Sequence, residues 1–309
     1  QSQHNAAVGG IWADHHRMFA KFLRKNNPSS VLELGGAHGI LSKEYKQFDK
    51  IPWTILEPNP APVDGCEAHF IKGFFDEKFT YHEPFDAIVH SHVFEHIYEP
   101  DKFMRHLSKF MDTGQRLVFS LPNMEAMLER KYTNCLNYEH TVFLTEPYVD
   151  FLLAKHGFHL LAKEYFMDNH SIFYSTVCDP AVEPAPLQPR LYEKNKRLYM
   201  DFVLHHEELI MDLNSKLSEL TQPIYLFGAH VFAQYLIEFG LDTSGIFGLL
   251  DNDPKKQGKR LYGTSLTVQS PKVLRDVVRP IVILKAGVYN QEIKEDFLKN
   301  INNAVTFLE

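Results

Sequence analysis

The sequence predicts an α/β protein in which a doubly wound, mostly parallel sheet is followed by a second, smaller α/β domain. Apolar runs of strand length alternate with helical runs in both halves of the chain, as in sheets that helices cover on both faces. The first expected strand of each half is apolar and enters a glycine turn, "VLELGGAHG" from residue 31 and "PIYLFGAH" from residue 223. The 309 residues, 44% of them hydrophobic, can fill two cores.

The first half is expected to contain one helix ahead of the sheet and then the sheet itself. The segment "GIWADHHRMFAKFLRK" places Trp12, Phe19 and Phe22 at helical spacing. After the strand at residue 31, further strands are expected at 53–58, 68–73, 85–92 and 115–122, and the helical pattern "PDKFMRHLSKFM" separates the last two. Residues 147–178 add one helix and two strand-like runs.

Prolines mark the boundary between the two halves. The segment "DPAVEPAPLQPR" is too rich in proline for a helix interior or a central strand, so we expect a linker. Residues 190–220 then carry leucines at helical spacing, which predicts a long amphipathic helix. We therefore expect a first domain at 1–180, a linker and helix at 181–222, and a second domain at 223–309.

Composition argues against several partners. The net charge of -7 provides no basic field for a nucleic acid or an anionic membrane surface. The three cysteines lie far apart and form no CxxC pair, which fits a reducing cytoplasm rather than a disulfide framework. No apolar run approaches the roughly 20 residues that cross a bilayer. The chain begins at Gln1 without a methionine, which leaves room for a segment upstream to have been removed.

An acidic residue lies at the end of the second strand, at a distance from the glycine turn that is typical of nucleotide-binding sheets. Glu57 lies about twenty residues beyond the glycine turn, where a carboxylate can accept hydrogen bonds from both hydroxyls of a ribose. The turn has glycines at 35, 36 and 39, which does not match the G-x-G-x-x-G pattern of dinucleotide sites. Polar residues in "HSHVFEHIYEP" crowd the end of the fourth strand, at the edge where open α/β sheets bind ligands.

These segments resemble the class I S-adenosylmethionine-dependent methyltransferases. "VLELGGAHG" is similar to their first motif, "ILEPN" to their second, and "FDAIVHSHVFEHIYEP" to their signature after the fourth strand. The resemblance implies S-adenosylmethionine as cofactor, with Glu33 at its methionine end and Glu57 on its ribose. The residues expected to bind it are Glu33, Gly35, Gly36, Gly39, Glu57, Pro58, Phe74, Ser91 and His92. A nicotinamide dinucleotide is a weaker alternative, because it needs a place for its pyrophosphate.

The resemblance extends to nearly the full chain. The N-terminal helix, "NYEHTVFLT", "DNHSIFY" and residues 223–309 are similar to the nucleotide-sugar C-methyltransferases, which add a Rossmann-like C-terminal domain to a Rossmann-like methyltransferase domain. This implies methylation, on carbon by preference, of a small sugar-like or nucleotide-linked metabolite that the second domain helps to bind. Family members usually begin with a cysteine-rich zinc-binding domain, and this sequence contains none.

Two polar segments are expected to perform the chemistry. The family's Tyr-His-Glu-His motif appears here as "NYEH", and its Gly-Gly-Ser segment as "NHS". An imidazole that titrates near neutrality suits removal of a proton from the acceptor, so we expect His140 to be the base and Glu139 to orient it or bind a substrate hydroxyl. Asn137 is expected to assist catalysis, for example by stabilising an oxyanion. The residues expected to bind substrate are Tyr138, Asn169, His170 and Ser171.

The other histidines are expected to be less important. His90, His92 and His96 lie close together but lack ligand spacing, so no metal site is expected. The pairs at 15–16 and 205–206 are expected at the surface, although the first pair could line the substrate pocket. Three alternatives stay open: transfer to oxygen, transfer to nitrogen, and a non-catalytic cofactor-binding partner. The 190–220 helix is also a candidate surface for a homodimer.

Overall fold

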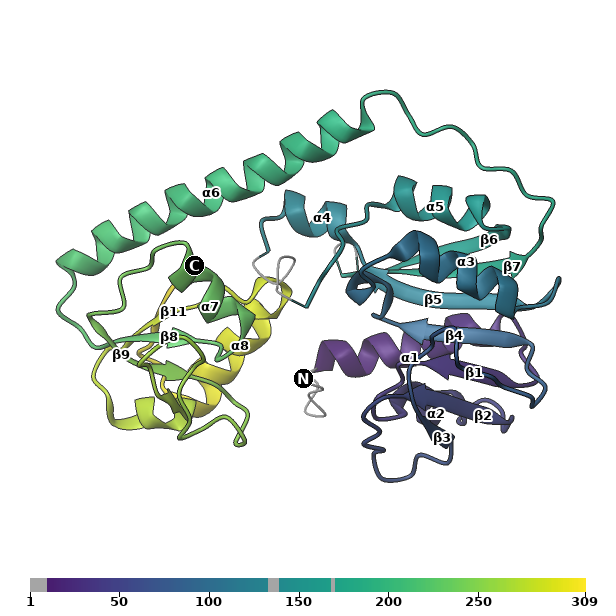
Figure 1. Ribbon diagram of the computed structural model, residues 1–309. Coiled ribbons are helices and arrows are strands. Elements are labelled where there is room, and N and C mark those ends of the chain that lie inside the picture. Colours follow the sequence, from purple (N-terminus) through teal and green to yellow (C-terminus); the bar gives the residue numbers. More distant parts are fainter. Residues whose placement is uncertain (1–9, 133–138, 168–169) are drawn as a thin grey trace. The chain divides into compact units, whose positions relative to one another are not determined.

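The computed structural model describes residues 10–132, 139–167 and 170–309, and it divides into two compact units (Figure 1). The first unit ends at Leu191. The second comprises Tyr192–Glu309 and a short segment that begins at Met127. The long helix α6 (Leu191–Glu219) therefore falls in the second unit, whereas the sequence analysis placed it with the linker. Residues 181–190 contain no helix or strand.

The first unit is built on a seven-stranded sheet with the spatial order β3-β2-β1-β4-β5-β7-β6. Its strands are β1 (Val31–Leu34), β2 (Trp53–Glu57), β3 (His69–Lys72), β4 (Ala87–Ser91), β5 (Arg116–Pro122), β6 (Phe158–Phe166) and β7 (Ser171–Cys178). Neighbouring strands from β3 to β5 are parallel, and β7 runs antiparallel to both β5 and β6. The strands predicted for this half, and the mostly parallel sheet, are confirmed.

Helices cover both faces of this sheet. They are α1 (Gly10–Arg24), α2 (Ile40–Tyr45), α3 (Pro100–Phe110) and α5 (Glu146–Lys155), with a short 3-10 turn η1 (Phe94–His96) after β4. The short helix α4 (Met124–Glu129) spans the boundary at which the two units divide. Successive residues of β1 enter different cores: Val31 packs with Phe19 of α1, and Leu32 packs with Leu107 of α3. This alternation follows from strand geometry, and it explains why these strands are apolar throughout.

The second unit contains a five-stranded sheet in the order β10-β9-β8-β11-β12, in which every pairing is parallel. Its strands are β8 (Ile224–Phe227), β9 (Ile246–Leu250), β10 (Val268–Gln269), β11 (Ile281–Ile283) and β12 (Thr306–Leu308). Its helical segments after α6 are α7 (Val231–Glu238), η3 (Pro271–Asp276), η4 (Gly287–Tyr289), α8 (Asn290–Asp296) and η5 (Phe297–Ile301). Leu213 of α6 lies in one core of this unit, which confirms the predicted packing stripe.

The topology of the first sheet locates the site. The chain leaves β1 toward β2 on one side, and β4 lies on the other side, so the direction of the connections switches between β1 and β4. Open α/β sheets bind ligands outside the carboxyl ends of the strands at such a switch point. The segments that begin at Gly35, Glu57 and His92 meet at this edge. Among the described helices, none has the length and apolar character of a membrane span.

Candidate functional site

The glycine turn after β1 is tightly packed against its neighbours. Gly35 and Gly39 have φ angles of 71° and 68°, a region that side chains rarely adopt. A Cβ on Gly36 would lie 2.7 Å from Oε1 of Glu33, and a Cβ on Gly35 would lie 2.8 Å from Cγ2 of Val93. The three predicted glycines therefore allow close approach of the backbone to buried groups of the protein itself, as well as to any ligand at this edge.

Glu57 joins the second strand to the glycine turn. Its carboxylate is buried and accepts two backbone N–H groups, from Ala37 at 3.1 Å and from Asn59 at 2.8 Å. The N–H of Ala61 in turn donates to the carbonyl of Ala37 at 3.1 Å. The loop after β2, which starts with the half-buried Pro58, is thus held against the turn, and a fixed negative charge stands where the sequence predicts the ribose.

Glu33 is a second buried carboxylate, within β1. The indole N–H of Trp53 donates to its Oε2 at 2.7 Å. Burial raises the pKa of Glu33 to about 7, and the nearby charge of Glu57 adds to the rise although the Trp53 hydrogen bond opposes it. A cationic ligand group beside Glu33 would favour its ionised form, so the position suits the ammonium end of an amino acid-like ligand.

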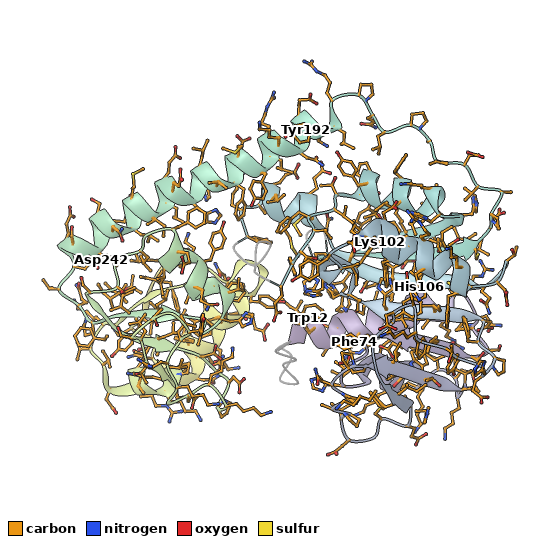
Figure 2. All side chains as sticks on the ribbon, viewed as in Figure 1. Trp12, Phe74, Lys102, His106, Tyr192 and Asp242 are labelled. Atoms are coloured by element: carbon orange, nitrogen blue, oxygen red, sulfur yellow. The ribbon has the colours of Figure 1, made fainter. Side chains whose placement is uncertain are left out.

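The remaining predicted cofactor residues differ in exposure. Ser91 ends β4, and its hydroxyl lies 2.8 Å from that of Ser120 on β5. Phe74 is 70% exposed in the loop after β3, where Figure 2 labels it. The preceding residue, Gly73, donates its N–H to the carbonyl of Glu57 at 3.2 Å, so this loop also begins at the ligand edge.

His92 links three elements through its ring. Its Nδ1 lies 3.0 Å from Oε1 of Glu95, and its Nε2 lies 2.9 Å from Oγ of Ser171. Its backbone has a φ of 52°, and its N–H donates to the carbonyl of Ser120. Because both ring nitrogens are engaged with protein groups, a contact of His92 with a cofactor would involve its backbone or the face of its ring.

Two predicted substrate residues are deeply buried. Ser171 lies at the start of β7, and its hydroxyl is 2.6 Å from Nδ1 of His170 as well as within reach of His92. Burial lowers the pKa of His170 to about 3, so this imidazole is neutral near pH 7. The other predicted residues of these two segments, Asn137, Tyr138 and Asn169, lie outside the described residues.

The predicted surface position of His15 is wrong. Its ring is fully buried against Phe19, Phe166 and Phe173, and neither ring nitrogen has a hydrogen-bond partner among the described residues. Helix α1 packs on the sheet along this side, and burial lowers the pKa of His15 well below its ordinary value. Trp12, labelled in Figure 2, lies one turn earlier on α1 with its ring centroid 4.8 Å from that of His92.

The predicted surface position of His206 is also wrong. It lies on α6 in the second unit and is 1% exposed, with its ring centroid 4.3 Å from that of Phe202. Its Nδ1 is 2.9 Å from the carbonyl of Phe202 one turn before it. In both histidine pairs one member faces the core because neighbouring helix positions point in different directions.

His140, the predicted base, lies next to the turn that follows β4. The backbone N–H of Thr141 donates to the carbonyl of Glu95 at 2.9 Å, and Nδ1 of His96 lies 2.7 Å from the carbonyl oxygen of Glu139. Glu95, His96 and His140 each offer one side-chain atom, and these atoms lie within 4.8 Å of one another. Burial raises the pKa of Glu95, but His92, His96 and His140 around it lower the pKa more.

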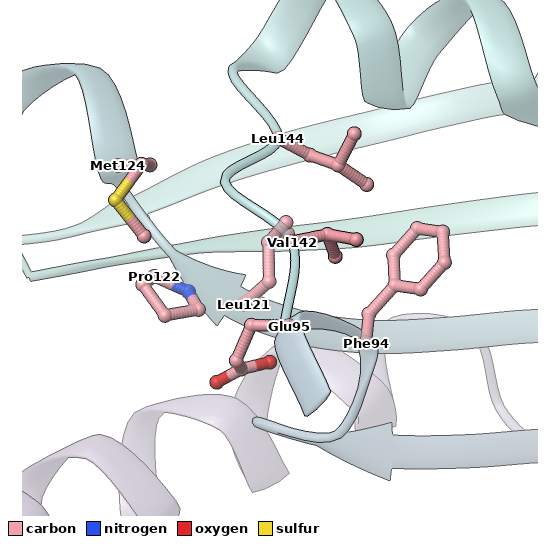
Figure 3. A pocket seen from close by; sticks show the side chains of 7 residues that line it. All are labelled: Phe94, Glu95, Leu121, Pro122, Met124, Val142 and Leu144. Atoms are coloured by element: carbon pink, nitrogen blue, oxygen red, sulfur yellow. The ribbon is translucent and has the colours of Figure 1, made fainter. Parts of the chain in front are cut away.

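Glu95 also lines a small pocket at this edge (Figure 3). The other lining residues are apolar: Phe94, Leu121, Pro122, Met124, Val142 and Leu144. The Oε2 atom of Glu95 has no hydrogen-bond partner among the described residues. Glu95 is not among the site residues that the sequence predicts, and the signal for it is its place in the polar segment that follows the buried strand β4.

In the second unit, Asp251 accepts backbone hydrogen bonds as Glu57 does in the first unit, but it also pairs with a lysine. Asp251 follows β9 and accepts the backbone N–H of Ala229 at 2.9 Å, in the turn after β8. It also accepts the N–H of Asp253 at 2.9 Å. In addition, Nζ of Lys256 lies 3.0 Å from its Oδ2, so a cation of the protein neutralises this carboxylate.

Comparisons with known proteins identify the first unit. A family model described as a methyltransferase domain matches residues 6–163. Similar solved structures include 1,6-didemethyltoxoflavin-N1-methyltransferase of Burkholderia thailandensis, 13% identical over 55% of this chain and 81% of that one, with a TM-score of 0.43. Another is the N-methyltransferase NodS of Bradyrhizobium japonicum WM9, 15% identical over 55% and 97%, with a TM-score of 0.42. A third is magnesium protoporphyrin IX methyltransferase of Synechocystis PCC 6803, 14% identical over 56% and 89%, with a TM-score of 0.43. No curated protein matches the chain.

Proposed function

The chain belongs to the methyltransferase domain family, and from this premise we propose that it methylates a small sugar-like or nucleotide-linked metabolite on carbon. The protein is an S-adenosylmethionine-dependent methyltransferase, so its cofactor is S-adenosylmethionine. The choice of acceptor and of carbon is our proposal, and it is supported by the similarity to the nucleotide-sugar C-methyltransferases and by the second unit.

Two buried carboxylates fit the cofactor. The observation that carries the assignment is that Glu57 is fixed to the N–H of Ala37 in the glycine turn, so its charge stands at the switch point of the sheet. There it can accept hydrogen bonds from a ribose. Glu33, one strand away, would face the ammonium group of the methionine part, because its carboxylate lies against the glycine turn, where a Cβ on Gly36 would be 2.7 Å from its Oε1.

The acceptor must be aligned and must lose a proton. When bound, the cofactor supplies a methyl group that the positive charge of its sulfur already activates. The protein's part is to place the acceptor in line and to help remove its proton. We assign the second task to His140 together with Glu95 and His96, because these three ionisable groups converge and Glu95 also lines the pocket.

The second unit supports a nucleotide-linked acceptor. Its strand order places two strands on either side of β8, and Asp251 relates to Ala229 as Glu57 relates to Ala37. We propose that it is a Rossmann-like domain that binds part of the acceptor rather than a second cofactor. Lys256 neutralises Asp251, so its carboxylate is a weaker ribose acceptor than the carboxylate of Glu57.

Replacing Glu57 with glutamine tests the cofactor site. The change removes the charge and one of the two acceptors that hold the backbone at Ala37 and Asn59. Hydrogen bonds to charged groups contribute about 1.5 to 3 kcal/mol, so we expect the Kd of S-adenosylhomocysteine to rise about 10- to 150-fold in calorimetric titration. Glu99→Gln, an exposed change in the same unit, is the control. An unchanged Kd in Glu57→Gln would remove Glu57 from the site.

A further inference from the structure

Three side chains beside the pocket have the composition of a metal site. Glu95 and His96 lie in the 3-10 turn η1, and His140 comes from a segment more than 40 residues later. Their ligand-capable atoms all lie within 4.8 Å of one another. We propose that Glu95, His96 and His140 bind a divalent transition-metal cation of the zinc class, which in turn binds an oxygen of the methyl acceptor.

The state of Glu95 is the first argument. The side chain is 5% exposed, and its Oε1 is paired with Nδ1 of His92 at 3.0 Å. Its Oε2 is buried without a hydrogen-bond partner among the described residues. A buried carboxylate oxygen that lacks a partner costs on the order of 1 to 3 kcal/mol or more, and a cation bound there would remove this cost.

The orientation of His96 is the second argument. A carbonyl oxygen can only accept, so the 2.7 Å contact between Nδ1 of His96 and the carbonyl of Glu139 places the proton on Nδ1. The lone pair of Nε2 is then available to a metal. Metal-binding histidines usually donate their other N–H to a carbonyl or carboxylate, which fixes the tautomer and the ring. The carboxylate of Glu95 is oriented in its turn by His92, whose Nδ1 lies 3.0 Å from Oε1 of Glu95.

Backbone contacts on both sides of His140 hold this residue in place, which is the third observation that supports the site. Its neighbours on both sides contact η1, Glu139 through the contact with His96 and Thr141 through the hydrogen bond to the Glu95 carbonyl. Bonds of about 2.1 Å join a metal to nitrogen or oxygen, so two ligand atoms on one cation lie at most about 4.2 Å apart. A shift of a fraction of an ångström brings the three atoms into this range.

The ligand set determines the class of cation. Two imidazoles and one carboxylate suit zinc, manganese, iron or cobalt, whereas magnesium and calcium prefer oxygen ligands. Three protein ligands leave a coordination position open, as in catalytic zinc sites. An acceptor oxygen bound there would be polarised, which would favour loss of a proton from the neighbouring acceptor atom to solvent water. This role of the cation rests on the proposed function, whereas the binding of the cation does not.

The proposed ligands differ from the histidines that the sequence grouped together. His90 is buried, with its ring stacked 4.9 Å from that of Phe119, and both ring nitrogens of His92 are engaged with protein groups. Only His96 of that group is retained. No metal site was expected from the sequence, because His96 lies past the end of the strand and no cysteine or aspartate near the three histidines has ligand spacing.

The test is direct binding of cations to the untagged full chain after removal of metals with a chelator. We expect calorimetry to give about one Zn²⁺ per chain, and Co²⁺ to give visible absorption bands typical of nitrogen and oxygen ligands. Glu95→Gln, His96→Asn and His140→Asn should each weaken Zn²⁺ binding at least about 100-fold, and His92→Asn about 10- to 100-fold. His69→Asn, at an exposed position of β3, is the control and should bind Zn²⁺ as the wild type does.

Titration of the same samples with S-adenosylhomocysteine separates this inference from the proposed function. If wild type binds S-adenosylhomocysteine but neither Zn²⁺ nor Co²⁺, the metal site is wrong and the function stands. If Zn²⁺ binds and S-adenosylhomocysteine does not, the cofactor site is wrong. Equal Zn²⁺ affinity in His69→Asn and His140→Asn, or in wild type and all three variants, would also overturn the metal site. The Co²⁺ spectrum of the wild type provides a result even where a variant fails to fold.

Discussion

Replacing His140 with alanine is expected to lower the turnover number at least about 100-fold and to leave the affinity for S-adenosylhomocysteine unchanged. His140 is one of three ionisable side chains that converge, of which Glu95 lines the pocket. The carboxylates that we propose for the cofactor, Glu33 and Glu57, lie on β1 and β2. The change therefore removes acceptor activation, whether His140 acts as a base or as a metal ligand. Single-turnover rates and calorimetric titration measure the two effects separately.

The matched control for His140 is His159→Ala, at an exposed position of β6 in the same unit. It should retain both the turnover number and the cofactor affinity of the wild type. A His140→Ala protein with wild-type turnover would contradict the assignment of the chemistry to this side chain. A loss of cofactor affinity as large as the loss of turnover would contradict the separation of the two sites.

Replacing Glu33 with glutamine is expected to stabilise the protein at high pH. The pKa of Glu33 is about 7 in the folded protein against an ordinary 4.5, so the folded state keeps a proton that the unfolded state has lost. Wild-type stability therefore falls as the pH rises from 4.5 to 7, and the full penalty, about 3 kcal/mol, is present above pH 7. Glutamine is neutral throughout and avoids it.

Melting temperatures of wild type and Glu33→Gln at pH 5 and pH 8 test this prediction without the cofactor. The variant should melt higher than wild type at pH 8, with a much smaller difference at pH 5. The same variant should bind S-adenosylhomocysteine more weakly at pH 8, because it lacks the charge that we propose faces the ammonium group. Equal effects on melting at both pH values would contradict the burial of an ionised carboxylate, and an unchanged affinity would contradict its contact with the ligand.

The gain in stability and the loss of binding have one cause. The carboxylate of Glu33 is buried beside Trp53 at a cost in stability, and we propose that the ammonium group of the cofactor offsets this cost when it binds. Residues of binding sites often carry such a cost. Glu57 differs, because two backbone N–H groups already satisfy its carboxylate in the protein alone.

The sequence was most informative where local pattern determines structure. The apolar strand at residues 31–34 and the glycines after it are a local signal, and so is an acid at the end of the next strand, Glu57. These features predicted the first sheet, and the family resemblance that they carry implied S-adenosylmethionine; the sheet order and the family match confirm both. The second sheet was visible for the same reason, since "PIYLFGAH" repeats the pattern.

The sequence was least informative where distant segments meet. Glu95 contacts the segment around His140 through the backbone hydrogen bond from Thr141, 46 positions later in the sequence. No periodic pattern of residues predicts such a contact. The burial of His15 depends likewise on which side of α1 packs on Phe166 and Phe173 of the last two strands of the first sheet. The surroundings of these two side chains are determined by tertiary packing, which cannot be predicted from helix or strand propensity or from the spacing of residues.

The measurement that tests the central claim most directly is carbon NMR of the product formed from methyl-13C S-adenosylmethionine. The untagged full chain would be incubated with this cofactor and a panel of nucleoside diphosphate sugars, with and without a keto group. We predict a labelled methyl group bonded to carbon in a keto sugar. A label on oxygen or nitrogen would contradict carbon transfer, and the absence of a labelled product across the panel would contradict the proposed class of acceptor.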